Sequence, residues 1–131
     1  MKFQANVTKI EVDGDTDRQM VFFDIDGQSI SGFIEFPMSV YALPKNQRTF
    51  VIELIPVPDK TYTARWEIPA ENIDYTDAKI VFNTILYEVG RYGEMLNARF
   101  SAGGFQFRLM TEEEKFPFEL ERGIYYKLIV R

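Results

Sequence analysis

The sequence predicts an all-β fold, most simply a closed antiparallel barrel of about eight strands. Apolar residues recur at every second position through most of the chain, which is the pattern of strands with one buried face. Turns rich in glycine and aspartate separate these segments, and helical patterns are few. Because many short strands in one small domain need protected edges, we expect the sheet to close on itself. An OB-like Greek-key barrel is the favoured architecture, and a β-sandwich is the alternative.

The first three strands are predicted from alternating apolar residues that turn one side of each strand toward the core. These strands cover residues 2–12, 19–25 and 29–36, and the inward residues of the second and third are Val21, Phe23, Ile25, Ile30, Gly32, Ile34 and Phe36. Asp26 and Gly27 predict a two-residue type I′ turn between the second and third strands, because both central residues of that turn have positive φ. Residues 37–46 are expected to form one short turn or an ordered loop.

The rest of the chain continues the same alternation. Inward residues are predicted at Phe50, Ile52 and Leu54, at Tyr62, Ala64, Trp66 and Ile68, and at Ile124, Tyr126, Leu128 and Val130. Further strands are predicted over residues 79–89, 94–102 and 105–109. A turn is expected over residues 90–93. The Gly103-Gly104 pair predicts a tight hairpin, since glycine adopts backbone angles that other residues resist.

The composition fits a single domain over residues 1–131 without catalytic side chains of the usual kinds. The chain is 46% hydrophobic and contains neither cysteine nor histidine. This excludes disulfides and thiolate nucleophiles, and it removes the usual general base and the commonest metal ligand. We therefore expect no enzyme activity, no cofactor and no metal site. The net charge of −5 argues against a domain that binds nucleic acid mainly through phosphates.

Two acidic motifs suggest chemistry, but each has a simpler structural interpretation. Residues 24–27, Asp-Ile-Asp-Gly, resemble the first motif of haloacid-dehalogenase-type phosphatases, in which the first aspartate attacks phosphorus. That family also has a lysine motif and a second acidic motif further along the chain, carried on a parallel α/β sheet. The sequence shows neither of these motifs and no βαβ pattern. Residues 13–17 resemble the start of a calcium loop, without the glycine and glutamate that such a loop needs further on. We expect a solvent-facing Asp24 and two turns, and an ordinary loop around Glu71, Asp74 and Asp77.

Other charged and aromatic residues leave alternatives open. The acidic run 112–114 is expected to be a soluble loop, or else an acidic patch that meets a basic partner. Most of the phenylalanines are expected in the core, with base stacking on an OB-type surface as the alternative, for Phe22, Phe23, Phe33, Phe36, Phe100, Phe105 and Phe107. Polar strand positions hold basic residues that would form a stripe if their strands were neighbours, namely Arg65, Arg99, Arg108 and Lys127.

The stretch 96–109 is the most specific part of the sequence. It reads L-N-A-R-F-S-A-G-G-F-Q-F-R-L and resembles the L-S-A-x-V-S-x-G-G-L-L-M-R-L run of the eighth-subunit family of archaeal and eukaryotic RNA polymerases, called RpoG in archaea. Looser similarity follows in the same order over nearly the whole chain, at residues 7–13, 40–41, 50–52, 85–89 and 125–130. The loops after the strand at 50–55 and before the Gly-Gly hairpin are shorter than in eukaryotic members, which suggests an archaeal member.

The resemblance implies an OB-like barrel subunit that docks on the largest RNA polymerase subunit, away from the catalytic centre, and supports assembly and stability of the enzyme. Such a subunit performs no nucleotidyl transfer itself, takes no cofactor or small-molecule substrate, and belongs in the archaeal cytoplasm, or in the nucleus if the source were eukaryotic. No apolar run in the sequence approaches the ~18 residues of a membrane span, so we expect no membrane segment. The predicted partner interface is the hairpin and its flanks, at Arg99, Gly103, Gly104, Phe105 and Arg108. Glycines there let a partner backbone approach, and the arginines would pair with carboxylates. The alternative function is a free OB-type protein that binds single-stranded nucleic acid.

Overall fold

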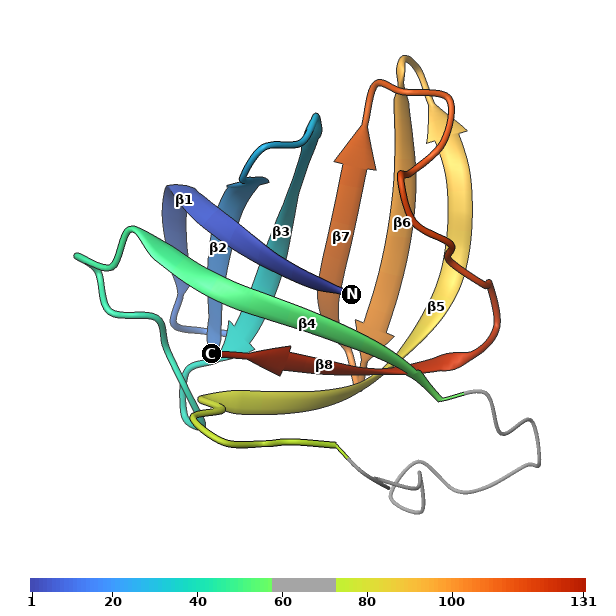
Figure 1. Cartoon of the computed structure of the whole chain (residues 1–131). Coiled ribbons are helices and arrows are strands. Elements are labelled where there is room, and N and C mark those ends of the chain that lie inside the picture. The colour runs from blue at the N-terminus through green and yellow to red at the C-terminus, as the bar shows by residue number, and fades with distance from the viewer. Residues whose placement is uncertain (58–72) are drawn as a thin grey trace.

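The chain forms an all-β barrel in the computed structural model, which describes residues 1–57 and 73–131 (Figure 1). In these two ranges there are eight strands and no helix. The strands are β1 (Lys2–Asp13), β2 (Arg18–Ile25), β3 (Ile30–Pro37), β4 (Thr49–Val57), β5 (Ile80–Tyr92), β6 (Met95–Ala102), β7 (Phe105–Thr111) and β8 (Tyr125–Val130). The strand predicted at residues 62–68 lies outside the described residues, as do Arg65 and Glu71.

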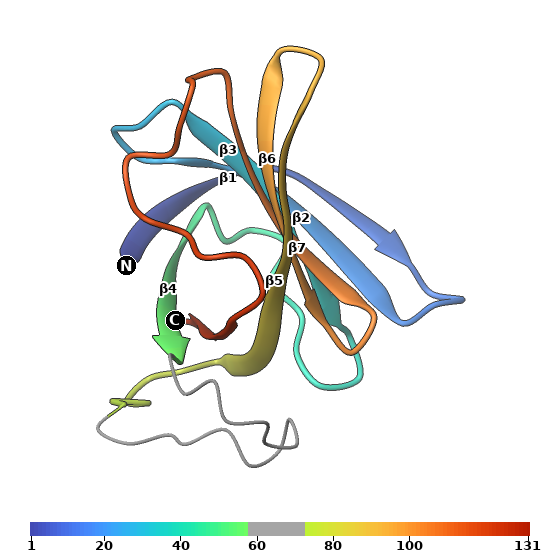
Figure 2. The same ribbon diagram turned by 90° about the vertical axis from the view of Figure 1, so that its right-hand side faces the viewer.

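The strands close into one antiparallel barrel in the order β1-β2-β3-β7-β6-β5-β8-β4, which confirms the predicted fold class. The order contains two Greek keys, because three hairpin-connected strands are followed each time by a fourth that returns beside the first. In one key β4 returns to β1, and in the other β8 returns to β5. The two halves join where β3 pairs with β7 and where β4 pairs with β8. Figure 2 shows the β1–β2 hairpin projecting beyond the barrel.

Aromatic rings fill the middle of the barrel. Phe107 packs against Phe100 with ring centroids 5.2 Å apart and stacks on Phe23 at 6.2 Å. Phe100 also meets Tyr126 edge-on at 5.6 Å. All four side chains are at most 2% exposed. Since burying one such side chain stabilises the fold by about 1.5–3 kcal/mol, these four together contribute roughly 6–12 kcal/mol to the driving force for folding.

One end of the barrel is closed by the connection from β3 to β4, residues 38–48. Leu43 of this connection is buried, and the side chain of Gln19 holds its backbone from within the barrel. The Gln19 amide donates to the Leu43 carbonyl at 2.9 Å, and the Leu43 N–H donates to Gln19 Oε1 at 2.7 Å. Tyr41 adds an edge-on contact with Phe36 at 5.2 Å. The stretch predicted as a short turn or ordered loop is therefore an ordered plug.

The opposite end is covered by the connection from β7 to β8, residues 112–124. Phe116 and Phe118 stack at 5.7 Å, and Phe118 packs on Phe3 of β1 at 5.2 Å. The backbone N–H of Glu121 donates to the Tyr126 hydroxyl at 2.9 Å, which ties the end of this segment to the core. Each Greek key therefore uses its long connection to close one end of the barrel.

The turns follow the predictions in part. Gly103 and Gly104 form a two-residue hairpin turn with φ of 59° and 96°, as expected for type I′. Asp26-Gly27 is not such a turn, because only Gly27 has positive φ and the connection spans residues 26–29. The reason is that the Asp26 N–H donates to the Gln4 carbonyl at 2.9 Å, which keeps Asp26 in the β1–β2 pairing. The turn predicted at residues 90–93 is formed instead by residues 93 and 94, because β5 continues to Tyr92.

Gly32 lies where β3 and β7 approach each other closely. It faces inward in β3 opposite Leu109 of β7, at the seam between the two halves. A Cβ atom at this position would lie 2.1 Å from the backbone oxygen of Arg108 and 2.9 Å from Cζ of Phe23. No side chain fits there, and the Phe23 ring occupies the space that one would need.

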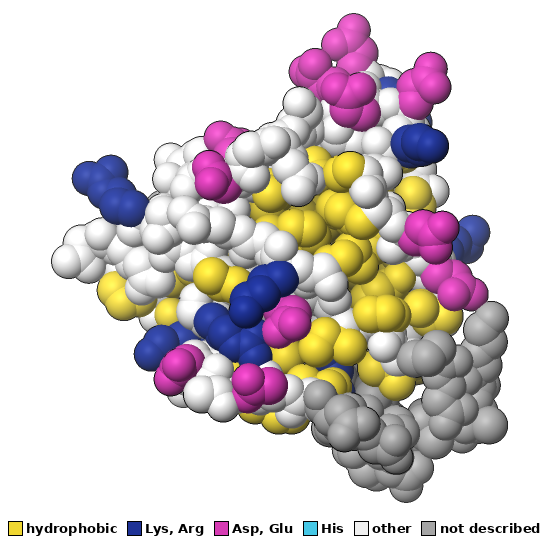
Figure 3. Space-filling view, in the orientation of Figure 1, with side chains coloured by type: hydrophobic (Ala, Val, Ile, Leu, Met, Phe, Trp, Pro, Cys, Tyr) yellow, Lys and Arg dark blue, Asp and Glu magenta, His cyan; other side chains and the backbone are white. Residues whose placement is uncertain are grey.

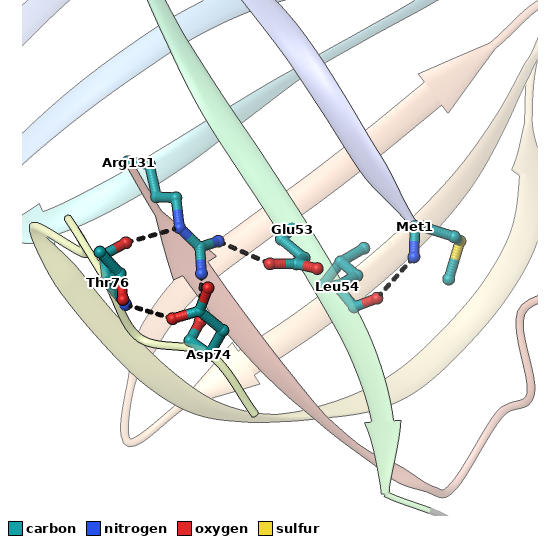
Figure 4. Close-up of polar contacts among 6 residues, drawn as sticks. All are labelled: Met1, Glu53, Leu54, Asp74, Thr76 and Arg131. Atoms are coloured by element: carbon teal, nitrogen blue, oxygen red, sulfur yellow. Dashed lines mark hydrogen bonds and ion pairs between the residues drawn. The ribbon is translucent and has the colours of Figure 1, made fainter. Parts of the chain in front are cut away.

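Both ends of the chain are fixed to β4 (Figure 4). The ammonium group of Met1 donates to the Leu54 carbonyl at 3.0 Å, and the Arg131 guanidinium pairs with the Glu53 carboxylate at 2.5 Å. Arg131 also donates to the carbonyls of Thr76 and Asp74. Hydrogen bonds from the hydroxyl and the backbone N–H of Thr76 lower the pKa of the Asp74 carboxyl, with a smaller contribution from Arg131.

Candidate functional site

The predicted interface arginines lie on the outer face of the barrel, in a row of side chains that crosses six neighbouring strands. Strand register places these residues opposite one another in turn, as Lys9, Phe22, Phe33, Arg108, Arg99 and Glu88. We call them the outer-face row. The row is set by β-bulges in β1 and β5, each of which shifts the register by one residue just before its member of the row. It combines aromatic rings, two adjacent cations and an acid at one end.

Arg99 and Arg108 are directly opposite each other on β6 and β7. Each guanidinium lies over an aromatic ring, Arg99 at 4.4 Å from the ring centre of Tyr92 and Arg108 at 4.9 Å from that of Phe33. Neither arginine takes part in an ion pair within residues 1–57 and 73–131. The Nε atoms of both are shielded from solvent and have no hydrogen-bond partner in this part of the chain.

The charges around this pair leave it positive. Burial lowers the pKa of Arg108, and the neighbouring Arg99 lowers it further. An arginine nevertheless stays protonated at neutral pH, so both guanidinium groups carry a full charge. The nearby Glu35 carboxylate is already engaged, because it pairs with Arg18 at 2.9 Å and accepts the Gln106 N–H at 2.7 Å. Glu88 faces Arg99 across the strands without forming an ion pair among the described residues.

The glycine hairpin ends the same two strands. Nothing lies within 4 Å of the Cβ positions of Gly103 and Gly104, so the tip of the hairpin is open. Phe105 is covered by Arg18, whose guanidinium lies 4.4 Å from the ring centre and donates to the Gly104 carbonyl at 3.0 Å. Arg18 therefore joins the hairpin to β2, and sequence reasoning did not identify it. The one sequence feature that pointed to Arg18 is its position directly after the acidic stretch 13–17.

Of the predicted basic stripe, the structure brings together Arg99 and Arg108. Lys127 lies on β8, on the far side of β5 from β6, and it is buried. Burial lowers the pKa of its ammonium group, which donates to Asn83 Oδ1. Lys127 is therefore separate from the outer-face row, and Arg65 lies outside the described residues.

Most of the phenylalanines considered for base stacking are in the core, as the alternation predicts. The fully buried ones are Phe23, Phe36, Phe100 and Phe107. Phe33 points outward from β3 and is nevertheless only 8% exposed, because Arg108 and Phe22 lie against it. The period of two indicates which side of the sheet Phe33 is on, but it does not show what covers that side.

The acidic motifs take the structural roles expected for them. Asp24 is exposed on β2, between two antiparallel neighbours, which is not the parallel-sheet setting of the phosphatase motif. The turn at 14–17 is held by Asp17, whose carboxylate accepts hydrogen bonds from the N–H and hydroxyl of Ser39 at 3.0 and 2.6 Å. Within the described part of the chain, no group of three or more acidic residues is arranged to hold a metal ion.

A second surface feature lies beside the segment that covers the barrel end. Val89 and Leu96 face residues 114–120 across an open hollow of about 580 Å³. In Figure 3 apolar side chains gather at the centre of the face shown, with charged side chains around them.

Among the described residues, no helix is long and apolar enough to cross a membrane.

Comparison with known proteins adds no relative. No protein-family model matches the chain, and no curated protein matches it. The resemblance to the RNA polymerase subunit family therefore rests on the residues named from the sequence, and the family remains a prediction.

Proposed function

We propose that this chain is a non-catalytic small subunit of archaeal DNA-directed RNA polymerase, which docks on the largest subunit and supports assembly and stability of the enzyme in the cytoplasm. The observation that carries the proposal is the outer face of the β6–β7 hairpin, where Arg99 and Arg108 have no acidic partner among the described residues. This hairpin holds the stretch 96–109, which is also the stretch that most resembles the family. The most specific part of the sequence therefore coincides with a surface where two adjacent cations have no acidic partner among the described residues.

The chemistry of this surface suits binding. A guanidinium does not give up its proton at neutral pH, so neither arginine serves as a general acid or base. What the pair offers is a set of fixed hydrogen-bond donors with positive charge, which is what carboxylates and phosphates require. Side chains of this kind are enriched where proteins dock on one another.

The proposal is tested by isolating the complex that the chain forms in its native cell. The affinity-tagged full-length chain should recover the largest RNA polymerase subunit in about equal amount, together with the rest of the enzyme. The double variant Arg99→Glu/Arg108→Glu should lose most of this recovery. The matched control is Lys45→Glu/Arg48→Glu, which makes the same change of charge at two exposed residues of the β3–β4 connection. Recovery of other proteins without polymerase subunits would refute the proposal.

A second candidate function, single-stranded nucleic-acid binding, is favoured by one observation. Phe22 is partly exposed in the outer-face row, with Lys9 at 5.4 Å from its ring centre and Phe33 at 5.7 Å on the other side. Aromatic rings flanked by cations bind bases and phosphates in many single-strand binders. This function predicts that the isolated chain binds a fluorescent oligothymidylate with an affinity that falls steeply with salt. Unchanged anisotropy at low salt would exclude it.

A further inference from the structure

The arginine pair of β6 and β7 is unfavourable in the free chain. Like charges directly opposite each other on neighbouring strands repel, and a shielded donor without a partner loses the hydrogen bond that it would make to water. Arg99 and Arg108 combine both features. An opposite charge from outside the chain would relieve the repulsion between the two guanidinium groups.

The two guanidinium groups are also held in place before anything binds. The rings of Tyr92 and Phe33 support one side of each group, at 4.4 and 4.9 Å. Of the side-chain nitrogens in these two residues, the Nε atoms are the ones fully shielded from solvent. The terminal nitrogens are left to donate outward, and little side-chain entropy remains to be lost when a ligand binds.

The acidic side chains around Arg99 and Arg108 limit how large an anion can bind to them. Glu88 lies at one end of the row, and at the other end Lys9 is paired with Glu11 at 2.5 Å. The exposed carboxylate of Asp24 stands one row away on β2. A nucleic-acid strand presents a run of phosphates and requires a run of cations, whereas here the positive charge is confined to two adjacent side chains. A single carboxylate fits this charge pattern.

We propose that Arg99 and Arg108 form a clamp that binds one aspartate or glutamate side chain of a partner protein between their guanidinium groups. The inference rests on the proposed function for the identity of the partner, which is the largest polymerase subunit. The clamp itself requires only an acidic residue on whichever protein covers this face.

The clamp can be tested by converting one of its arginines into a group that reacts with carboxylates. Arg108→Lys keeps the charge and places a primary amine at the site. In the purified complex, a water-soluble carbodiimide activates a carboxylate as its O-acylisourea. The lysine amine then displaces a urea and forms an amide bond. Mass spectrometry should find residue 108 joined to an aspartate or glutamate of the partner, and Arg99→Lys should join to the same residue.

Variants that remove the charge separate binding from folding. Arg99→Gln/Arg108→Gln should reduce recovery of the partner at least tenfold, while the melting temperature of the free chain stays equal to or above that of the wild type. A merely structural role for the arginines predicts the opposite, a lower melting temperature. If this variant failed to fold, the cross-linking result with the single lysine variants would still decide the question.

The outcomes distinguish the clamp from the proposed function. A cross-link to a protein other than a polymerase subunit would support the clamp and refute the function. Recovery of the polymerase with no cross-link from either lysine variant, and with full binding by the glutamine variant, would refute the clamp alone. Oligothymidylate binding by the wild type that is lost in Arg99→Glu/Arg108→Glu, with no cross-link, would overturn the clamp in favour of a nucleic-acid site.

Discussion

Replacing Gly32 with alanine tests the seam between β3 and β7 directly. The new Cβ atom would lie 2.1 Å from the backbone oxygen of Arg108, a distance at which one of the two strands must move. It would also lie 2.9 and 3.2 Å from two carbons of the Phe23 ring. The ring belongs to the central aromatic cluster, where Phe50 meets it edge-on at 5.7 Å, so it has little room to withdraw.

The cost follows from these contacts. Inserting one extra carbon into a packed core costs about 1–3 kcal/mol. Moving β3 away from β7 also weakens neighbouring ladder hydrogen bonds, each of which contributes about 1 kcal/mol. We expect the free energy of unfolding to fall by about 4 kcal/mol in total. For a domain of this size that corresponds to a drop in melting temperature of roughly 12–20 °C.

Urea denaturation followed by far-UV circular dichroism, with calorimetry for the melting temperature, would measure the change. Gly14→Ala is the matched control, because nothing lies within 4 Å of its Cβ position and its φ is not positive. That variant should differ from the wild type by less than about 1 kcal/mol. If Gly32→Ala unfolded within about 1 kcal/mol of the wild type, the close approach of the two strands at this point would be wrong.

Three further predictions concern the plug, the β4 contacts and the hairpin. Gln19→Leu should lower the free energy of unfolding by about 2–4 kcal/mol in urea denaturation, because it strands the buried N–H and carbonyl of Leu43, whereas Gln28→Leu in the exposed β2–β3 connection should change it little. The depressed pKa of Asp74 stabilises the folded state above its ordinary value of 3.8, and this contribution is lost as the pH falls through the lower folded value. Asp74→Asn should therefore flatten the dependence of melting temperature on pH below pH 3.8. An unchanged slope would contradict the lowered pKa of Asp74. Gly103→Ala should cost about 1 kcal/mol because φ is 59° there, and Gly103→Asn should cost less, since asparagine tolerates that conformation; equal costs for both would argue against it.

The fold was predictable because the alternation is regular and the barrel buries one face of each strand. The inward positions of Val21, Phe23 and Ile25, for example, are set by a period of two and need no knowledge of neighbouring strands. The turn at Asp26-Gly27 was predicted wrongly because its geometry depends on a residue far away in the sequence. Its geometry depends on a hydrogen bond to Gln4, which lies on a strand that local sequence does not identify as a neighbour.

The candidate site was predictable only in part. Arg99 and Arg108 were placed at polar positions of adjacent strands. The two-residue turn of the hairpin sets the register that brings these two residues opposite each other. The rings of Tyr92 and Phe33 were missed as their supports. Tyr92 was assigned to a turn, and the contact with Phe33 depends on the pairing of β3 with β7, which are far apart in the sequence.

The two Greek keys make the protein a pair of complementary fragments. Residues 1–57 contain one key and residues 73–131 the other, and each key alone would end in two open strand edges. The edges of the first, β3 and β4, are the ones that β7 and β8 of the second cover. A chain divided between the keys therefore carries the information to reassemble, since each half supplies the hydrogen bonds that the other lacks. Such a divided barrel would report, through its own reassembly, on whether two attached proteins meet.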